Sequence, residues 1–169
     1  MATETLNELS SAVGRLLKDK GEMLVTAESC TGGGVSAAVT AISGSSEWFD
    51  RAFVTYSNEA KQQMLRVSAA TLEAHGAVSE EIAREMALGA LAASPGTISV
   101  SVTGVAGPTG GTRLKPVGMV CFAWARCGEA MPRSETRHFS GDRESVRQQS
   151  VVRALQGIVE LLDDGGARP

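Results

Sequence analysis

Residues 23–34 read Met-Leu-Val-Thr-Ala-Glu-Ser-Cys-Thr-Gly-Gly-Gly, and the rest of the chain can be placed around them. Met23–Ala27 is a short apolar run of strand length, and the apolar stripe of Thr31–Ile42 predicts a helix. Ser29 would then follow the carboxyl end of a strand, where open α/β sheets place ligands. The free N–H groups of the first helical turn would suit a phosphate or an oxyanion. We therefore interpret Ala27–Gly34 as a turn that holds a small anionic ligand beside a nucleophile.

Two features of this turn allow more than one interpretation. The glycines at 32–34 let a ligand or another backbone approach closely, or they only relieve crowding behind a capping Ser29 or Thr31. Glycine costs about 1 kcal/mol relative to alanine in a helix, so three in succession favour a functional role. Cys30 is a candidate nucleophile because a helix N-terminus lowers a thiol pKa, although a small packing residue is the commoner role.

The rest of the chain alternates helices and strands. Further strands are predicted at Phe49–Tyr56, Ile98–Thr103, Val117–Ala125 and Arg133–Phe139. Helices are predicted between Leu6 and Gly21, at Asn58–Leu65, between Ser68 and Gly76, from Ser79 to about Ala93, and from Asp142 to Leu162.

This order predicts the fold. Strands separated by helices pair in parallel, whereas the last two strands are close enough in sequence for a hairpin. We expect an α/β fold, a three-layer α/β/α sandwich around a mixed, mostly parallel sheet. One domain would span residues 1–169, with residues 1–4 and 163–169 frayed.

Composition excludes several classes of protein. The net charge is −3 and the 16 Lys and Arg residues are scattered, so we expect no nucleic-acid partner. The three cysteines have no metal-site spacing, and no apolar run approaches the roughly 20 residues that span a bilayer. We expect a cytoplasmic protein with no membrane partner and no metal.

A second chemical segment is Val54-Thr-Tyr-Ser-Asn-Glu-Ala-Lys61. With Ser57 as helix N-cap, Tyr56 and Lys61 occupy the two positions that commonly pack together across a helix entry. A hydroxyl and an amine would thus meet at another strand's carboxyl end. The alternative, favoured by this segment alone, is a half-buried tyrosine beside a lysine that snorkels to the surface.

A third segment, the glycine-rich loop Gly104–Pro116, follows a strand directly. It lacks the Gly-Lys-Ser/Thr ending of a Walker loop and matches no dinucleotide fingerprint. It is either a loop that covers a ligand or an ordinary connection between strands. With only His75 and His138 in the chain, neither in a glycine-rich turn, a Ser-His-Asp triad is not expected.

Six stretches together resemble the CinA carboxy-terminal domain family, whose stand-alone members are nicotinamide-nucleotide amidohydrolases. The resemblance covers residues 5–162. The stretches are Thr26-Ala-Glu-Ser-Cys-Thr-Gly-Gly, Phe53-Val-Thr-Tyr-Ser-Asn-Glu-Ala-Lys, His75-Gly-Ala-Val-Ser, Gly104-Val-Ala-Gly-Pro-Thr-Gly-Gly, Lys115-Pro-Val-Gly and Phe139-Ser-Gly-Asp-Arg.

The resemblance implies hydrolysis of the carboxamide of nicotinamide mononucleotide to nicotinate mononucleotide and ammonia, in the recycling of pyridine nucleotides. It implies a homo-oligomer that uses no metal or other cofactor. Two alternatives stay open: a nucleotide-binding regulatory or protein-interaction module without catalysis, and an amidase for another small carboxamide. Ammonia release from nicotinamide mononucleotide separates the first alternative from the enzyme, and a substrate panel separates the second.

By motif, the catalytic residues that the resemblance implies fall on Ser29, Lys61 and Tyr56. Ser46 is an alternative nucleophile because it belongs to a second family-like stretch. Ser29 is preferred because the predicted helix N-terminus beside it can stabilise an oxyanion. A neutral Lys61 would take the serine proton, which requires a lowered lysine pKa, and Tyr56 would relay or orient that proton. The expected substrate-binding residues are Cys30, Thr31, Gly32, Gly33, Asn58, Gly104, Gly107, Gly110, Gly111 and Lys115.

Overall fold

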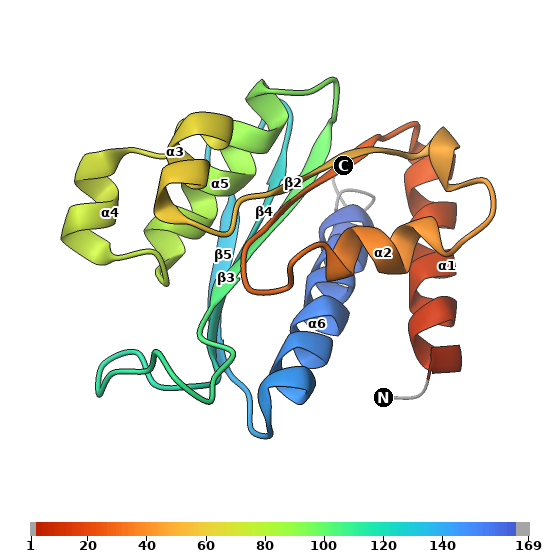
Figure 1. The fold of residues 1–169 in the computed structure, drawn as a ribbon. Coiled ribbons are helices and arrows are strands. Elements are labelled where there is room, and N and C mark those ends of the chain that lie inside the picture. The colour runs from red at the N-terminus through yellow and green to blue at the C-terminus, as the bar shows by residue number, and fades with distance from the viewer. Residues whose placement is uncertain (1–2, 165–169) are drawn as a thin grey trace.

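The structure is a computed structural model that describes residues 3–164, and it contains a five-stranded sheet between two layers of helices (Figure 1). The sheet has the spatial order β2-β1-β3-β4-β5. β1 pairs in parallel with β2 and β3, whereas β4 runs antiparallel to β3 and β5. Four strands therefore point the same way, and the predicted α/β/α sandwich with a mixed, mostly parallel sheet is confirmed. The strands are β1 (Leu24–Glu28), β2 (Phe49–Val54), β3 (Ile98–Gly104), β4 (Met119–Arg126) and β5 (Arg133–His138).

The helices divide between the two faces of the sheet, with α1, α2 and α6 on one face and α3, α4 and α5 on the other (Figure 1). Within residues 3–164, no helix has the length and apolar character of a membrane span. α1 and α6 include residues 3–4 and 163–164, which were expected to fray; residues 1–2 and 165–169 lie outside the described part. The helices are α1 (Thr3–Lys20), α2 (Gly34–Thr40), α3 (Asn58–Leu65), α4 (Ala69–His75), α5 (Glu80–Ala92) and α6 (Arg143–Asp164), with a short 3-10 turn at Ser45–Glu47.

The chain reverses its direction of winding at β1. It leaves β1 through α2 to reach β2, and returns through α3–α5 on the opposite face to reach β3 on the other side of β1. Helices on opposite faces allow both parallel crossovers to be right-handed, as such connections almost always are. The reversal creates a switch point at the carboxyl ends of β1 and β3, which is where open α/β sheets bind ligands.

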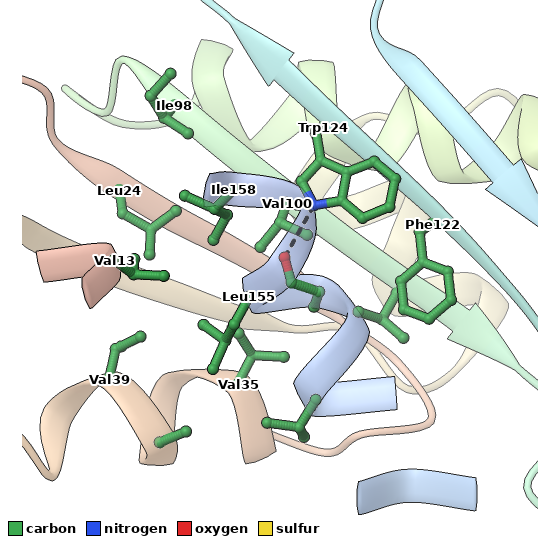
Figure 2. Close-up of a cluster of buried hydrophobic side chains, with 14 of the residues drawn as sticks. Val13, Leu24, Val35, Val39, Ile98, Val100, Phe122, Trp124, Leu155 and Ile158 are labelled. Atoms are coloured by element: carbon green, nitrogen blue, oxygen red, sulfur yellow. Dashed lines mark hydrogen bonds between the residues drawn. The ribbon is translucent and has the colours of Figure 1, made fainter. Parts of the chain in front are cut away.

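The α1–α2–α6 face is packed with large apolar side chains. Figure 2 shows Trp124 and Phe122 of the sheet over Leu155 and Ile158 of α6. The indole N–H of Trp124 donates to the Ala154 carbonyl at 2.9 Å, so its polar atom is satisfied inside the core. A Cβ at position 157 would lie 2.0 Å from the Trp124 ring, so only glycine lets α6 approach the sheet this closely.

The opposite face has one apolar cluster that includes Leu65, Ile82 and Met86 and another made of small residues around β4, and hydroxyl groups on β3 bond to the segments that cover it. Ser99 donates to the Ala87 carbonyl at 2.7 Å, and Ser101 donates to the Ala83 carbonyl at 2.6 Å. Thr103, one pleat further, donates to the Ala77 carbonyl at 2.8 Å. The alternation of Ile98, Val100 and Val102 with these residues therefore separates an apolar face from a hydrogen-bonded one.

Helix boundaries follow local capping in most places, and the exception is α2. Ser57, Ser68 and Ser79 accept hydrogen bonds from backbone N–H groups three residues further on, as the predicted helix starts require. The predicted helix start at Thr31 is wrong, because Gly32 (φ 59°) and Gly33 (φ 101°) adopt left-handed conformations. α2 begins only after them, and its N-cap residue contributes no side-chain hydrogen bond.

Candidate active site

The carboxyl ends of β1, β2 and β3 open into a pocket of about 330 Å³, within the size range of small-molecule sites. The pocket lies at the switch point between β1 and β3. Among the described residues, its basic lining side chains are Lys61 and Arg143. The full lining consists of Ser29, Cys30, Tyr56, Asn58, Lys61, Ala77, Val78, Thr103, Gly104, Val105, Ala106, Gly107, Thr109, Gly110 and Arg143.

Lys61 and Ser29 meet inside this pocket. Lys61 Nζ lies 3.0 Å from Ser29 Oγ, and both residues are buried, with Lys61 only 1% exposed. The amine also donates to the backbone carbonyl of Thr55 at 3.0 Å and to that of Tyr56 at 3.2 Å. The first turn of α3 thus places its lysine under the end of β2, against the serine that follows β1.

Burial lowers the pKa of Lys61 below its usual value, and the neighbouring Cys30 opposes that shift less strongly. Within residues 3–164, no carboxylate lies in ion-pair distance of Nζ to hold the proton in place. The amine donates to Ser29 Oγ, and the Ser29 hydroxyl in turn donates to the Tyr56 carbonyl at 3.4 Å. A lysine of lowered pKa at this distance from a serine oxygen is placed to exchange a proton with it, as a general base does with its nucleophile.

The turn that carries Ser29 is fixed by its own backbone. The Ser29 N–H donates to the Val102 carbonyl of β3 at 2.9 Å, and the Ser29 carbonyl accepts from the Gly32 N–H at 3.0 Å. In the described part of the chain, no backbone carbonyl accepts from the N–H groups of Cys30 and Thr31. These two donors directly follow the serine, where acyl-transfer enzymes commonly hold the oxyanion.

The first N–H groups of α2 have a different role from the predicted one. The Glu28 carboxylate, fully buried, accepts from the Val35 N–H at 2.8 Å and the Ser36 N–H at 3.0 Å. It also accepts from the hydroxyls of Thr31 at 2.7 Å and Thr26 at 3.1 Å. The Val35 and Ser36 N–H groups at the start of α2 are therefore already bonded to an internal carboxylate and are not free for a ligand.

Cys30 lines the pocket as a neutral thiol. Burial is the main cause that raises its pKa to about 12, and its own backbone N–H and the nearby charges of Arg147 and Lys61 lower it by less. A protonated thiol is a weak nucleophile, and the side chain is 6% exposed in the main apolar cluster. The alternative of a packing residue is the one that fits.

Tyr56 reaches Lys61 through its backbone carbonyl and not through its phenol. The phenol oxygen instead accepts from Arg143 Nη2 at 3.2 Å, and the side chain is 63% exposed. Arg143 Nη1 also donates to the Gly107 carbonyl at 2.9 Å. The predicted contact between the Tyr56 phenol and the Lys61 amine is therefore not observed. The alternative, a half-buried tyrosine beside a lysine at the surface, is not observed either, because Lys61 is buried and Tyr56 is exposed.

The other expected site residues divide into two groups. Asn58, Gly104, Gly107 and Gly110 line the pocket. The remainder lie outside its lining: Thr31, Gly32 and Gly33 lie in the turn before α2, Gly111 lies further along the loop after β3, Lys115 donates from a separate hollow to the His75 carbonyl, and Ser46 is exposed beside the amino end of β2.

Sequence reasoning missed Arg143, although it quoted the Phe139–Arg143 stretch that contains it. A cation in the first turn of a helix opposes the helix dipole, and that local conflict is the signal that could have marked Arg143 as functional. Within residues 3–164, no group of three or more His, Cys, Asp and Glu side chains is arranged to hold a metal ion.

Comparisons with known proteins show which family the chain belongs to. A sequence profile of the CinA C-terminal domain matches residues 6–162. Nicotinamide-nucleotide amidohydrolase PncC of Escherichia coli K12 is 54% identical over 159 residues, covering 94% of this chain and 95% of that protein. A putative competence-damage inducible protein of Symbiobacterium thermophilum is 51% identical, covering 91% of this chain and 38% of its own length.

Among solved structures, a CinA superfamily protein from Klebsiella pneumoniae superposes with a TM-score of 0.90 at 40% identity. The match covers 94% of this chain and 98% of that one. Family profile, sequence relatives and fold therefore agree over nearly the same residues, and the chain belongs to the CinA C-terminal domain family.

Proposed function

We propose that this chain hydrolyses the carboxamide of nicotinamide mononucleotide to nicotinate mononucleotide and ammonia, as a step in the recycling of pyridine nucleotides. The observation that carries the proposal is the buried contact of 3.0 Å between Lys61 and Ser29. An amine base beside a hydroxyl suits attack on an amide carbon. The 54% identity to a nicotinamide-nucleotide amidohydrolase supports the choice of substrate.

The first step forms a bond between Ser29 Oγ and the carboxamide carbon. Neutral Lys61 accepts the serine proton as the bond forms, and the carbonyl electron pair moves to oxygen. The N–H groups of Cys30 and Thr31 would donate to that oxyanion. With Lys61 neutral, the Thr55 and Tyr56 carbonyls would accept its two N–H groups and leave the lone pair for the serine proton, and they would stabilise the ammonium afterwards.

The second step breaks the carbon–nitrogen bond. The oxyanion re-forms its carbonyl, Lys61 returns a proton to the leaving nitrogen, and ammonia departs from an ester on Ser29. A water molecule then adds to the ester carbon and gives its proton to Lys61. Collapse of that second intermediate releases the carboxylate product and returns the proton to Ser29, so the enzyme is regenerated.

Arg143 supplies the second half of substrate binding in this proposal. Its guanidinium lies at the pocket rim with two contacts, the Tyr56 phenol and the Gly107 carbonyl. A guanidinium pairs well with a phosphate because its donors match two phosphate oxygens. We assign the substrate phosphate to Arg143 and the adjoining loop, with Tyr56 as a pocket wall and not as a proton relay.

The decisive experiment measures ammonia release from nicotinamide mononucleotide, with nicotinamide riboside as the matched substrate without phosphate. We expect turnover of the nucleotide and at least about tenfold lower kcat/KM for the riboside, since a charged hydrogen bond contributes about 1.5–3 kcal/mol. Tight binding of the nucleotide without ammonia release would instead identify a binding module. Preference for another carboxamide in a substrate panel would contradict the substrate assignment.

A further inference from the structure

Arg147 of α6 holds the two peptide groups that follow Ser29. Its Nε donates to the Cys30 carbonyl at 3.1 Å, and its Nη2 donates to the Thr31 carbonyl at 3.1 Å. The arginine is 117 residues further along the chain than Cys30, so this is a tertiary contact. In the described part of the chain, no carboxylate lies in ion-pair distance of its guanidinium. The side chain is therefore committed to the turn.

Peptide planarity transmits this contact to the opposite side of the turn. A trans peptide directs its C=O and its N–H in opposite directions, so an arginine on the Cys30 carbonyl fixes the direction of the Thr31 N–H. The next peptide is held on both sides, by Arg147 on the Thr31 carbonyl and by the Ser29 carbonyl on the Gly32 N–H. The two N–H groups after Ser29 are thus held in place through the carbonyl sides of their peptides, and no backbone carbonyl occupies them.

The charge of the guanidinium has a second effect. A carbonyl that accepts from a cation is polarised, and its peptide N–H becomes a stronger donor, because hydrogen bonds in a chain reinforce one another. The Thr31 N–H belongs to such a peptide. Strengthening of this kind matters most when negative charge develops on the substrate oxygen, and it matters little for a neutral carboxamide in the ground state.

We propose that Arg147 is a positioning residue of the oxyanion hole, which orients and polarises the backbone N–H donors behind Ser29 without touching substrate. The inference rests on the proposed amidase function. It predicts that loss of Arg147 lowers kcat and leaves KM almost unchanged, since ground-state binding does not depend on these donors.

The test compares Arg147→Met and Arg147→Lys with the wild-type chain in steady-state assays on nicotinamide mononucleotide. We expect Arg147→Met to lose about 10- to 100-fold in kcat with KM within about twofold, a smaller loss than removal of an oxyanion donor itself. Arg147→Lys keeps the charge but not the planar pair of donors, and we expect it to lose about fivefold. Wild-type kcat in both folded variants would overturn the proposal.

A binding measurement separates positioning from general disturbance of the pocket. The first ligand is the nucleotide analogue that carries an aldehyde in place of the carboxamide. Ser29 Oγ adds to the aldehyde carbon, Lys61 takes the serine proton, and the aldehyde oxygen becomes the oxyanion. The second ligand, nicotinate mononucleotide, forms no such adduct. We expect Arg147→Met to weaken aldehyde binding by the same factor as kcat and to leave the Kd of nicotinate mononucleotide unchanged. Equal weakening of both ligands would show a merely structural role.

Arg153→Met is the matched control, because this α6 arginine bonds Glu135 and Glu160 and lies outside the pocket. We expect it to lower Tm and to keep the wild-type kcat. If Arg147→Met does not fold, Arg147→Lys decides, and a wild-type kcat there contradicts the inference. A wild-type chain that releases no ammonia refutes the proposed function instead, so the two failures are distinguishable.

Discussion

The turn after β1 and the turn after β2 lie side by side, joined by the Thr55 N–H on the Glu28 carbonyl at 2.8 Å, yet they treat buried charge in opposite ways. Glu28 ends β1 just before the first turn, and its carboxylate accepts four hydrogen bonds from β1, the turn and the start of α2. Lys61 lies in α3 just after the second turn, and its partners are two carbonyls and one hydroxyl.

This difference gives the two residues different roles: Glu28 supports the turn and Lys61 takes part in the reaction. Four donors can keep a buried carboxylate in place without a cation, so Glu28 makes the β1 turn a fixed platform for Ser29. An amine without a carboxylate partner is held less firmly in its charged form, so Lys61 can exchange its proton with the serine. The ends of two neighbouring strands thus provide a rigid support for Ser29 and a base, Lys61, that can lose its proton.

The largest expected effect comes from removing the nucleophile of the platform. Ser29→Ala should lower kcat by about 10⁴-fold or more, as loss of a covalent nucleophile does in other hydrolases. Nucleotide binding should persist, because Arg143 is untouched. The control is Ser46→Ala, which changes an exposed serine outside the pocket and should keep the wild-type rate of ammonia release. The reverse result would make Ser46 the nucleophile.

Removing the base should be the next largest effect. Lys61→Met keeps the length of the side chain and deletes the amine, so kcat should fall by about 10³-fold, within the range for general-base catalysis. Thermal unfolding should show that the variant is folded at the assay temperature. Turnover close to that of the wild type in a folded Lys61→Met variant would contradict the assignment of the base.

The lowered pKa of Lys61 predicts a pH profile. The base acts in its neutral form, so log kcat/KM should rise with slope near one until pH passes the folded-state pKa, which burial holds below the value of about 10.4 for free lysine. Stability has the same sign: between the two pKa values the unfolded chain binds more protons, so the free energy of unfolding rises with pH. Lys61→Met should flatten this part of the stability curve. If the free energy of unfolding of the wild type fell with pH in this range and that of Lys61→Met did not, the pKa of Lys61 would be raised in the folded state and not lowered.

A smaller effect should come from weakening the platform. Glu28→Gln replaces an acceptor of four hydrogen bonds by a group with one acceptor oxygen, and should lower the free energy of unfolding by about 1–3 kcal/mol. Ser57→Ala removes the side-chain cap of α3 and should cost about 1 kcal/mol. Chemical denaturation measures both. A smaller loss for Glu28→Gln than for Ser57→Ala would reverse the proposed contrast between the two turns.

The smallest effect is expected for Tyr56→Phe. The phenol bonds Arg143 at an exposed position, and the carbonyl that holds Lys61 is unchanged by the substitution. KM should rise by about two- to fivefold with little change in kcat, because one solvent-exposed hydrogen bond is lost. A fall in kcat of more than about 100-fold would restore the phenol as a proton donor or relay.

The sequence predicted the three layers and the order of helices and strands along the chain, because both depend on local periodicity and caps. Ser57, Ser68 and Ser79 each begin a helix where a side-chain oxygen can accept from the backbone, and such signals need no tertiary information. Lys61 and Ser29 were brought together by the resemblance of their motifs to a family; their separation of 32 positions carries no local signal.

The rest depended on contacts between distant segments. The sequence alone does not exclude Gly32 and Gly33 from a helix. Their left-handed backbone conformations, and the hydrogen bond from the Val35 N–H to the Glu28 carboxylate, show that the helix starts after them. Likewise, Arg143 and Arg147 come to the pocket and to the Ser29 turn because α6 packs against β3 and α2, which no window of sequence reveals.

The hydroxyls of β3 bear on how this pocket can evolve. Thr103 and Ala77 form one of its walls, and the hydrogen bond between them continues the series that joins Ser99 and Ser101 to α5. A mutation that moved this wall would have to loosen the sheet from its helix. Adaptation to a larger or smaller ligand is thereby confined to the loop at 105–110 and to the rim, and substrate range can drift while the reacting pair stays the same.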